Sequence, residues 1–509
     1  MTTLTSSQST LTRNALAVLQ PGFVGTTAPQ WLLRCLDEGL TAVGLFARNI
    51  ESSAQLAELT AQLRAVRPEV LVAIDEEGGD VTRLEAHTGS SFPGNLALGT
   101  VDDPDLTRDV AAELGRRLAE CGVNLNWAPS ADVNSNPGNP VIGVRSFGAD
   151  PELVARHTIA YIEGLQSVGV AASTKHFPGH GDTSVDSHHA LPRIDADLET
   201  LHARELVPFR AAVAAGTKVM MSAHILLPAL DETLPATLSP SALTGLLRAP
   251  ITEGGLGFDG LIVTDAVEMK AIADHHGVEH GTVLAIAAGA DAICVGGGLS
   301  DEATVLRLRD ALVAAVHSGE LPEERLAEAA GRVRALAEWT SAHAGAAAQR
   351  PVRADVGLAA ARRALHVTGA RSGDSELHVA AFTPMRNIAV GHETPWGLAN
   401  ELEPLLPGTT TADYRREHAE AEGTEALATR VLAEAGGRTI VGVVRDVHRH
   451  AWMAEVLAAV VAAEPDTVVV EMGVPQAPPT GALHLATHGA ARVCARAAAE
   501  VIAGTAEGS

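Results

Sequence analysis

The sequence has 509 residues, of which 46% are hydrophobic and 19% are charged, and its formal net charge is −25. Such a chain is long enough for two domains and too apolar for a disordered protein. The negative charge argues against nucleic acid and against an anionic membrane surface as partners.

The N-terminal segment MTTLTSSQSTLTRN lacks the basic and apolar regions of a signal peptide, and no apolar run approaches the roughly 20 residues that span a bilayer. The four cysteines, Cys35, Cys121, Cys294 and Cys494, are scattered without paired spacing. Cys35 and Cys294 lie in apolar surroundings, which is typical of small core residues in a reducing compartment. We expect a soluble, cytoplasmic protein.

Short apolar runs alternate with amphipathic stretches in the first part of the chain. The predicted strands are Ala15–Leu19, Ala42–Phe46, Val70–Ile74, Leu125–Pro129, Gly169–Ser173, Lys218–Ser222, Gly260–Thr264 and Ala292–Val295. The predicted helices between them include Ser53–Val66, Asp105–Cys121, Pro151–Val168 and Leu198–Ala215. Eight strands that alternate with helices predict a closed (β/α)8 TIM-type barrel, with a doubly wound open sheet as the alternative.

Several of these strands run directly into polar residues. Asp75, Lys175 with His176, His224 and Asp265 each follow the apolar part of a different strand. Because a barrel gathers the carboxyl ends of its strands around one pocket, we expect these side chains to converge.

Residues 175–188, KHFPGHGDTSVDSH, carry three of the 21 histidines and one of only three lysines of the chain. A chain that otherwise uses arginine and places a lysine here indicates a need for a compact ammonium group. Pro178, Gly179 and Gly181 forbid a regular helix, so we expect these polar groups to lie on a loop.

The chemistry of this stretch has three interpretations. His176 and His180, four residues apart, suggest metal ligands, but the Phe-Pro-Gly between them excludes the helix that would put both rings on one face. A polar loop held by its own hydrogen bonds is the second interpretation. Asp186 followed by Ser187 and His188 puts a carboxylate within reach of an imidazole, which can fix its tautomer and raise its basicity. We favour this third interpretation, acid/base catalysis.

The pattern changes past residue 340, and we predict a catalytic barrel over 1–340, a linker over 341–365 and a C-terminal α/β sandwich domain over 366–509. Its predicted elements are the strands Leu377–Phe382, Thr439–Val444 and Thr467–Met472 and the helix Ala490–Ile502. Arg445, Asp446 and His448 follow one of these strands, and we interpret them as a solvated loop end rather than ligand contacts.

The motifs of the first 300 or so residues, taken together, closely resemble the glycoside hydrolase family 3 β-N-acetylglucosaminidases, or β-N-acetylhexosaminidases, in their two-domain form. The matching segments, in the family's order, are DEEGGDVTRL (75–84), NWAPSADVNSNP (126–137), NPVIGVRSFG (139–148), the stretch 175–188, MMSAHI (220–225), PATLSP (235–240) and GFDGLIVTDAVEM (257–269). The resemblance implies a (β/α)8 barrel followed by an α/β sandwich domain. It also implies an enzyme that needs neither a metal nor another cofactor.

The resemblance also implies roles for single residues. Asp265 matches the nucleophile that forms a covalent glycosyl-enzyme intermediate, and His188 with its partner Asp186 matches the acid/base, where most retaining glycosidases use a second carboxyl group. The implied substrate contacts are Asp75, Arg83, Arg145, Lys175 and His176. Arg145 as a structural ion-pair partner and Asp265 as a helix cap are the alternatives.

Aromatic residues make up only 3% of the chain, which favours a pocket that holds one sugar ring through hydrogen bonds, and hence an exo-acting enzyme. Trp127, Phe147 and Phe177 lie near the motifs but fit a core equally well. The chain departs from the family at Glu76 and Asp80, and we interpret these as two added negative charges at the rim of the pocket that disfavour anionic aglycones.

We therefore expect cleavage of terminal β-linked N-acetylglucosamine from a small carbohydrate substrate. One alternative is a phosphorylase of β-N-acetylglucosaminides or β-glucosides that uses phosphate as acceptor, because a histidine acid/base is neutral after it gives up its proton and does not repel phosphate. A metal-dependent barrel hydrolase and a sugar-binding protein without turnover are the others. The joint presence of Asp265, Asp186 and His188 argues against binding alone.

Overall fold

The computed structural model describes residues 2–185, 191–371, 376–384, 389–391 and 393–506. Contacts divide the chain into two compact units. The barrel unit consists of Met1–Glu76, Thr107–Ile142 and Ala149–Arg353, and the second unit consists of Glu77–Leu106, Gly143–Gly148 and Ala354–Ser509.

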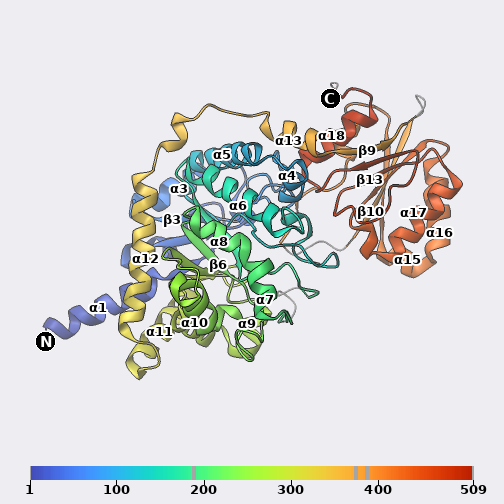
Figure 1. The fold of residues 1–509 in the computed structure, drawn as a ribbon. Helices are drawn as coiled ribbons and strands as arrows, with labels where there is room; N and C mark the ends of the chain where they lie inside the picture. Colours follow the sequence, from blue (N-terminus) through green and yellow to red (C-terminus); the bar gives the residue numbers. More distant parts are fainter. Residues whose placement is uncertain (1, 186–190, 372–375, 385–388, 392, 507–509) are drawn as a thin grey trace. The chain divides into compact units, whose positions relative to one another are not determined.

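Eight parallel strands form a ring in the barrel unit (Figure 1). They are β1 (Leu19–Pro21), β2 (Ala42–Leu45), β3 (Leu71–Ile74), β4 (Leu125–Asn126), β5 (Ala171–Phe177), β6 (Val219–Ser222), β7 (Leu261–Thr264) and β8 (Ile293–Val295). Strands β2 to β7 pair in chain order, a bridge from Val263 to Ala292 joins β7 to β8, and β1 pairs with β8 and runs beside β2. The predicted (β/α)8 barrel is confirmed.

Helices cover the outside of the ring. They are α1 (Thr2–Ala17), α2 (Gln30–Glu38), α3 (Ser53–Val66), α5 (Pro104–Glu120), α6 (Pro151–Gln166), α7 (Leu198–Thr200), α8 (Leu206–Ala214), α9 (Lys270–His276), α10 (Val278–Ala288), α11 (Glu302–Ser318) and α12 (Glu323–Ala342). Side-chain caps fix the start of several: Ser52 Oγ accepts the N–H of Gln55 (3.2 Å) at α3, and Asp301 Oδ1 accepts the N–H of Thr304 (2.8 Å) at α11.

The strands are buried on both faces, which explains why they read as continuous apolar runs. A core cluster gathers Leu71, Leu125, Val219 and Val263 with side chains of α12. Burying each such aliphatic side chain contributes roughly 1.5–3 kcal/mol. The aromatic rings near the motifs, Trp127, Phe147 and Phe177, are all buried, so the structure uses them as core rather than as stacking platforms.

Two local predictions are wrong. The predicted strand Ala15–Leu19 is mostly helix, because α1 runs to Ala17 with Leu11, Ala15 and Leu16 on its buried side, and β1 starts only at Leu19. Lys175 and His176 belong to β5 rather than to a loop, since the strand continues to Phe177 across a register shift with β6.

The second unit is built on one six-stranded sheet in the order β11-β10-β12-β13-β14-β9, parallel except for the edge strand β9. Its strands are β9 (His366–Gly369), β10 (Leu377–Thr383), β11 (Thr410–Arg415), β12 (Thr439–Val444), β13 (Val468–Glu471) and β14 (Leu483–Ala486), and its helices are α4 (Asn95–Val101), α13 (Val356–Ala364), α14 (Ala399–Leu402), α15 (Arg416–Glu422), α16 (Thr424–Ala435), α17 (Ala451–Ala463) and α18 (Arg492–Ile502). One core cluster joins one sheet face to α14 and α18, and another joins the opposite face to α16 and α17. This is the predicted α/β sandwich.

Segments 77–106 and 143–148 are also part of the second unit, although they interrupt the barrel in sequence. The N–H of Val493 donates to the carbonyl of Ser90 (3.3 Å), and Asp80 pairs with Arg445. The predicted boundaries at residues 340 and 366 concern the linear chain and stay predictions.

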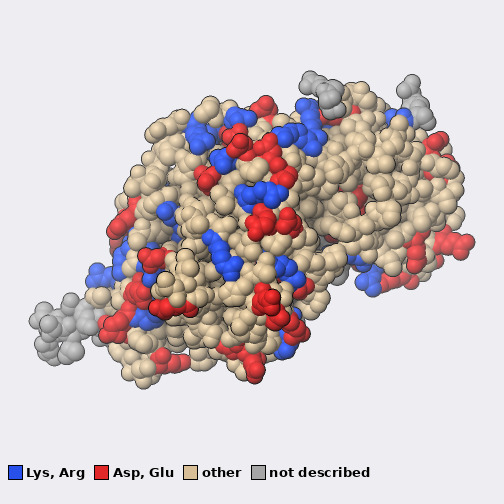
Figure 2. Space-filling model, viewed as in Figure 1, with Lys and Arg blue, Asp and Glu red and all other residues tan. Residues whose placement is uncertain are grey.

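Acidic and basic side chains are interspersed on the face of the molecule in Figure 2, and the basic ones form no large patch there. Within the described ranges, no helix combines the length and the apolar character that a bilayer crossing requires.

Candidate active site

Polar side chains of the barrel unit meet at the carboxyl ends of its strands, as predicted. Asp75 follows β3, Lys175 and His176 end β5, and Asp265 follows β7. The Lys175 ammonium group forms an ion pair with Asp75 Oδ1. The Lys175 side chain is 2% exposed and that of Asp75 is 21% exposed, so a buried cation holds a carboxylate that still reaches solvent.

Asp132, which follows β4, is the hub of this end of the barrel. Its Oδ2 accepts from His176 Nδ1 (2.7 Å) and from the Ser130 hydroxyl (2.9 Å), and its Oδ1 accepts the backbone N–H groups of His176 (3.2 Å) and His180 (2.7 Å). Burial alone would raise the pKa of Asp132, but the interactions with His176 and His180 hold it well below its ordinary value. Because this ionised carboxylate can only accept, it fixes a proton on His176 Nδ1, and Nε2 is then an acceptor in the neutral ring.

His180 is buried beside this cluster. Its Nδ1 lies 2.9 Å from the Thr183 hydroxyl, and its ring meets that of His176 edge to face at 6.0 Å. Burial, together with the nearby His176, lowers the pKa of His180 to about 4, against an opposing effect of Asp132 and Asp265. His180 is therefore neutral at pH 7, and the effect of Asp265 on its pKa indicates that the two side chains lie near one another.

Asp265 is held from two strands. Its N–H donates to the carbonyl of Ser222 (3.1 Å) at the end of β6, and its Oδ1 accepts the N–H of Ala266 (2.7 Å). His224 Nε2 donates to the carbonyl of Ala266 (2.9 Å), which fixes the backbone next to Asp265. Helix α9 begins only at Lys270, so Asp265 is not its cap.

The thiol of Cys294, in β8, gives a second indication that these groups converge. Its pKa is raised well above the ordinary value by burial and then by the carboxylates of Glu268, Asp265 and Asp75, with Lys175 acting in the opposite direction. Charged groups at the ends of β3, β5 and β7 thus act on one thiol in β8.

The remaining predicted site residues do not belong to the barrel unit or lie outside the described residues. Arg83 and Arg145 belong to the second unit, where Arg83 Nη2 donates to the carbonyl of Ala389 (2.9 Å) and Arg145 forms a bidentate ion pair with Glu77 (Nε–Oε2 3.0 Å, Nη2–Oε1 2.6 Å). Arg145 thus has an ion-pair partner, Glu77, as its structural interpretation requires. The predicted acid/base residues Asp186 and His188 lie outside the described residues.

The charges at residues 76 and 80 are not where we expected them. Glu76 and Asp80 are both buried and Asp80 pairs with Arg445, so the interpretation of these residues as two added negative charges at a solvent-facing rim is wrong. Asp446, next to Arg445, is buried, and its backbone has a left-handed conformation. Of these three residues only His448 is exposed, as the interpretation of a solvated loop end requires.

Sequence reasoning missed Asp132 as a site residue and left His180 and His224 unassigned. The signal for Asp132 was present: like Asp75 and Asp265, it is a carboxylate shortly after a barrel strand. Its partners come from a segment more than 40 residues away, which spacing alone does not reveal. Among the described residues, no group of three or more His, Cys, Asp or Glu side chains is arranged to hold a metal ion.

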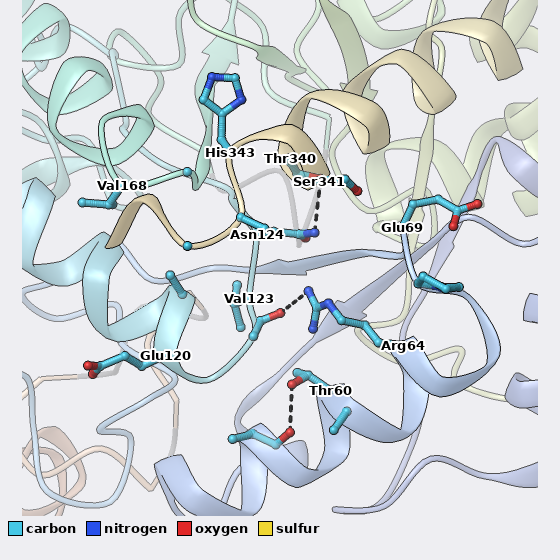
Figure 3. Close-up of a pocket in the computed structure, with 18 residues that line it drawn as sticks. Thr60, Arg64, Glu69, Glu120, Val123, Asn124, Val168, Thr340, Ser341 and His343 are labelled. Atoms are coloured by element: carbon cyan, nitrogen blue, oxygen red, sulfur yellow. Dashed lines mark hydrogen bonds between the residues drawn. The ribbon is translucent and has the colours of Figure 1, made fainter. Parts of the chain in front are cut away.

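A cavity of about 710 Å³ lies at the opposite end of the barrel, before the starts of β3, β4 and β5 (Figure 3). Its polar side chains bond the protein itself: Arg64 Nη2 donates to the carbonyl of Gly122 (2.6 Å), and Asn124 Nδ2 donates to the Thr340 hydroxyl (3.3 Å). Because catalytic groups of barrel enzymes lie at the carboxyl ends of the strands, this cavity is not the candidate active site.

We expect Asp132→Asn to destabilise the protein by about 1–3 kcal/mol, because an amide offers an N–H₂ group to donors and leaves one of them buried without an acceptor. The folded-state pKa of Asp132 is depressed, so its contribution is complete above the ordinary value of 3.8 and is lost only as the pH falls through the folded-state value. Urea unfolding of the wild-type protein and the variant at pH 7 and pH 3 gives the difference in their free energies of unfolding at each pH. Asp195→Asn, at a side chain 73% exposed and paired with Arg193, is the control and should change little; equal stability of the two variants at pH 7 would contradict the hub role.

Comparison with known proteins agrees with this arrangement. The profile of the "Glycosyl hydrolase family 3 N terminal domain" matches residues 28–336. A beta-hexosaminidase A of Pseudoalteromonas piscicida is 34% identical over 371 residues, which is 68% of this chain and 59% of that relative, so the chain spans less than two thirds of its length. A beta-hexosaminidase of Neisseria meningitidis serogroup C is 39% identical over 272 residues, or 52% of this chain and 73% of that protein.

The solved structure of a glycoside hydrolase family 3 beta-N-acetylglucosaminidase from Paenibacillus sp. str. FPU-7 superimposes with a TM-score of 0.85 at 34% identity. The match covers 98% of this chain and 97% of that one, so both units have counterparts there. A family profile over more than half of the sequence and a similar structure over nearly all of it lead to one conclusion: the chain belongs to glycoside hydrolase family 3.

Proposed function

We propose that this protein is an exo-acting retaining β-N-acetylglucosaminidase that releases terminal β-linked N-acetylglucosamine. The observation that carries the proposal is the cluster of Asp265, Asp75, Lys175 and His176 at the carboxyl end of the barrel. The names of the relatives support the choice of an N-acetylhexosamine as the sugar.

In this proposal Asp265 attacks the anomeric carbon, and the bond from that carbon to the aglycone oxygen breaks as the covalent glycosyl-enzyme forms. The contacts of Asp265 with Ser222 and Ala266 limit its movement, and His224 fixes the adjacent carbonyl. A nucleophile oriented in this way lowers the entropic cost of the attack.

Asp75 and Lys175 then hold the sugar as a pair. The carboxylate of Asp75 accepts from sugar hydroxyls, while its ion pair with the buried Lys175 limits its movement. His176, with its Nδ1 proton fixed by Asp132, accepts at Nε2 when neutral. Arg83 and Arg145 complete the proposed set of sugar contacts.

His188, oriented by Asp186, protonates the departing aglycone oxygen and then removes a proton from the incoming water. An imidazole with an ordinary pKa near 6.5 suits both steps at neutral pH. Because the ring is neutral once the aglycone has left, phosphate can also approach without meeting a second negative charge, and phosphorolysis is the alternative that the test must separate from hydrolysis.

The test is turnover of the nitrophenyl glycosides of β-N-acetylglucosamine and β-glucose, each with and without millimolar phosphate, followed by analysis of the sugar product. We expect turnover of the N-acetylglucosaminide at least 10-fold faster than of the glucoside, free N-acetylglucosamine as product, and no effect of phosphate on the rate; this margin is about 1.4 kcal/mol of discrimination. Accumulation of the sugar 1-phosphate would mean that the enzyme is a phosphorylase and not a hydrolase. Absence of turnover on both glycosides would refute the proposed activity.

A further inference from the structure

Three of the sequence motifs are joined to one another by hydrogen bonds next to Asp265. They are MMSAHI (220–225), PATLSP (235–240) and GFDGLIVTDAVEM (257–269), and the third contains the proposed nucleophile. The second has no role in the proposed mechanism. All three segments belong to the barrel unit, so the bonds between them lie within one compact body.

Thr237, in the short 3₁₀-helix Ala236–Leu238, is the centre of this network. Its side chain is fully buried. Its hydroxyl oxygen lies 2.8 Å from His224 Nδ1, 2.9 Å from the Ser222 hydroxyl and 2.9 Å from the carbonyl oxygen of Ala223. These three partners are consecutive in the chain, at the point where β6 ends. One hydroxyl group therefore holds the end of the strand together with the imidazole that follows it.

The hydrogen bonds of His224 fix which of its ring nitrogens carries a proton. Nε2 lies 2.9 Å from the carbonyl oxygen of Ala266, which can only accept, so Nε2 carries a proton. In the neutral ring Nδ1 is then an acceptor, and the Thr237 hydroxyl, which also faces the Ala223 carbonyl, donates to it. The Ser222 hydroxyl donates in turn to Thr237 Oγ1. Thr237 thus stabilises the tautomer that bonds to Ala266.

These contacts reach Asp265 from both sides along the chain. On the amino side, the carbonyl of Ser222 accepts the N–H of Asp265 (3.1 Å). On the carboxyl side, the N–H of Ala266 donates to Asp265 Oδ1 (2.7 Å), and the carbonyl of the same alanine accepts from His224. Thr237 holds both Ser222 and His224, so it links the two supports of Asp265 to each other.

We propose that Thr237 is a positioning residue for the nucleophile: by holding Ser222 and His224 it fixes the backbone on both sides of Asp265. The inference rests on the proposed function, because it assigns the benefit of this network to the attack of Asp265 on the anomeric carbon. Such an attack requires the two reacting atoms to lie about 3–3.5 Å apart and aligned, so a small displacement of the carboxylate costs rate. Sugar binding depends on Asp75 and the other proposed contacts, which this network does not include.

Thr237→Val tests the proposal, because valine keeps the shape of the side chain and lacks the hydroxyl. We expect kcat/KM to fall on the order of 10-fold, and equally for a nitrophenyl N-acetylglucosaminide and an N-acetylglucosamine disaccharide, since Asp265 attacks both. The inhibition constant of N-acetylglucosamine, which binds without reacting, should stay within about 2-fold of the wild-type value. Thr237→Ser keeps the hydroxyl and should recover most of the lost kcat/KM.

Thr217→Val is the matched control. Thr217 is a buried threonine that precedes β6, and, like that of Thr237, its hydroxyl has three partners among the described residues: Thr174 Oγ1 (2.9 Å), the carbonyl of Ala172 (3.2 Å) and the carbonyl of Val219 (3.1 Å). Thermal unfolding should show a similar loss of stability in both valine variants, while Thr217→Val keeps the wild-type kcat/KM. An equal fall of kcat/KM in the two variants would overturn the positioning role.

A pair of His224 variants covers the case in which Thr237→Val does not fold. The amide nitrogen of glutamine can replace Nε2 as a donor to the Ala266 carbonyl, whereas the shorter side chain of asparagine replaces only Nδ1. His224→Gln should therefore keep a kcat/KM at least about 5-fold higher than His224→Asn, with the same inhibition constant for N-acetylglucosamine in both. Equal kcat/KM values, or the reverse order, would contradict the proposed support of Asp265.

The proposed function and the positioning role fail in different ways. A wild-type protein without turnover, or a folded Asp265→Asn variant with wild-type turnover, would overturn the assignment of the nucleophile, whatever the effect of Thr237→Val. The positioning role alone would be overturned if Asp265→Asn abolished turnover while Thr237→Val kept the kcat/KM of the wild-type protein.

Discussion

Asp265→Asn is expected to lower kcat on every glycoside substrate by a factor on the order of 10⁴ or more, because an amide cannot form the covalent bond to the anomeric carbon. The side chain is held by the N–H of Ala266, which an amide oxygen accepts equally well, so the fold should survive. Steady-state kinetics and thermal unfolding of the same preparation measure the two effects.

Asp259→Asn is the matched control for this change. Asp259 precedes β7, as Asp265 follows it, and its side chain is almost fully exposed. Full activity is expected in this variant. A folded Asp265→Asn protein that keeps a tenth of the wild-type turnover would exclude Asp265 as the nucleophile.

His188→Ala is expected to have the second largest effect, and an unequal one. Loss of a general acid/base costs about 10²–10⁴-fold where the leaving group needs a proton, so turnover of an N-acetylglucosamine disaccharide should fall by that much. Formation of the glycosyl-enzyme from a nitrophenyl glycoside should be affected far less, since nitrophenolate leaves without protonation. Pre-steady-state release of nitrophenol, compared with disaccharide turnover, measures the difference.

Asp186→Ala should show the same trend as His188→Ala, more weakly, because it removes only the partner of the imidazole. His275→Ala, at an exposed position in α9, provides the histidine control and should leave both substrates unaffected. If both substrates lost activity equally in His188→Ala, the imidazole would not be the group that protonates the aglycone oxygen.

The sequence predicted the barrel because each of its strands is a short apolar run buried on both faces. Such a run can be recognised in the sequence even when the strands that pair with it are unknown. It missed strands in which burial does not set the pattern, and it also missed β14, a buried strand of only four residues. Strand β9 is exposed along its whole length and only one residue of β11 is fully buried, so neither has the pattern of a buried strand, although both pair in the sheet. Strand β1 was misplaced by a few residues because an apolar helix end leads into it.

The residues of the candidate site also divide into those that the sequence pattern revealed and those whose role it did not reveal. Asp75, Lys175, His176 and Asp265 could be found because each stands at the end of a strand, where the barrel geometry brings side chains together. Asp132 also stands shortly after a strand, but its role as a hub could not be predicted, because one of its bonding partners is a ring 44 residues later in the chain. Pairings of this kind depend on the folded loops.

The discontinuous composition of the second unit bears on how the protein is made. Its first piece ends at Leu106 and its last piece begins at Ala354, so 354 − 106 = 248 positions separate them along the chain. At ~5–20 residues per second, a ribosome needs roughly 12–50 s to bridge that interval. During this time Ser90 and the segment around it emerge without Val493, and Asp80 without Arg445. The second unit can therefore be completed only after the whole barrel unit has been synthesised.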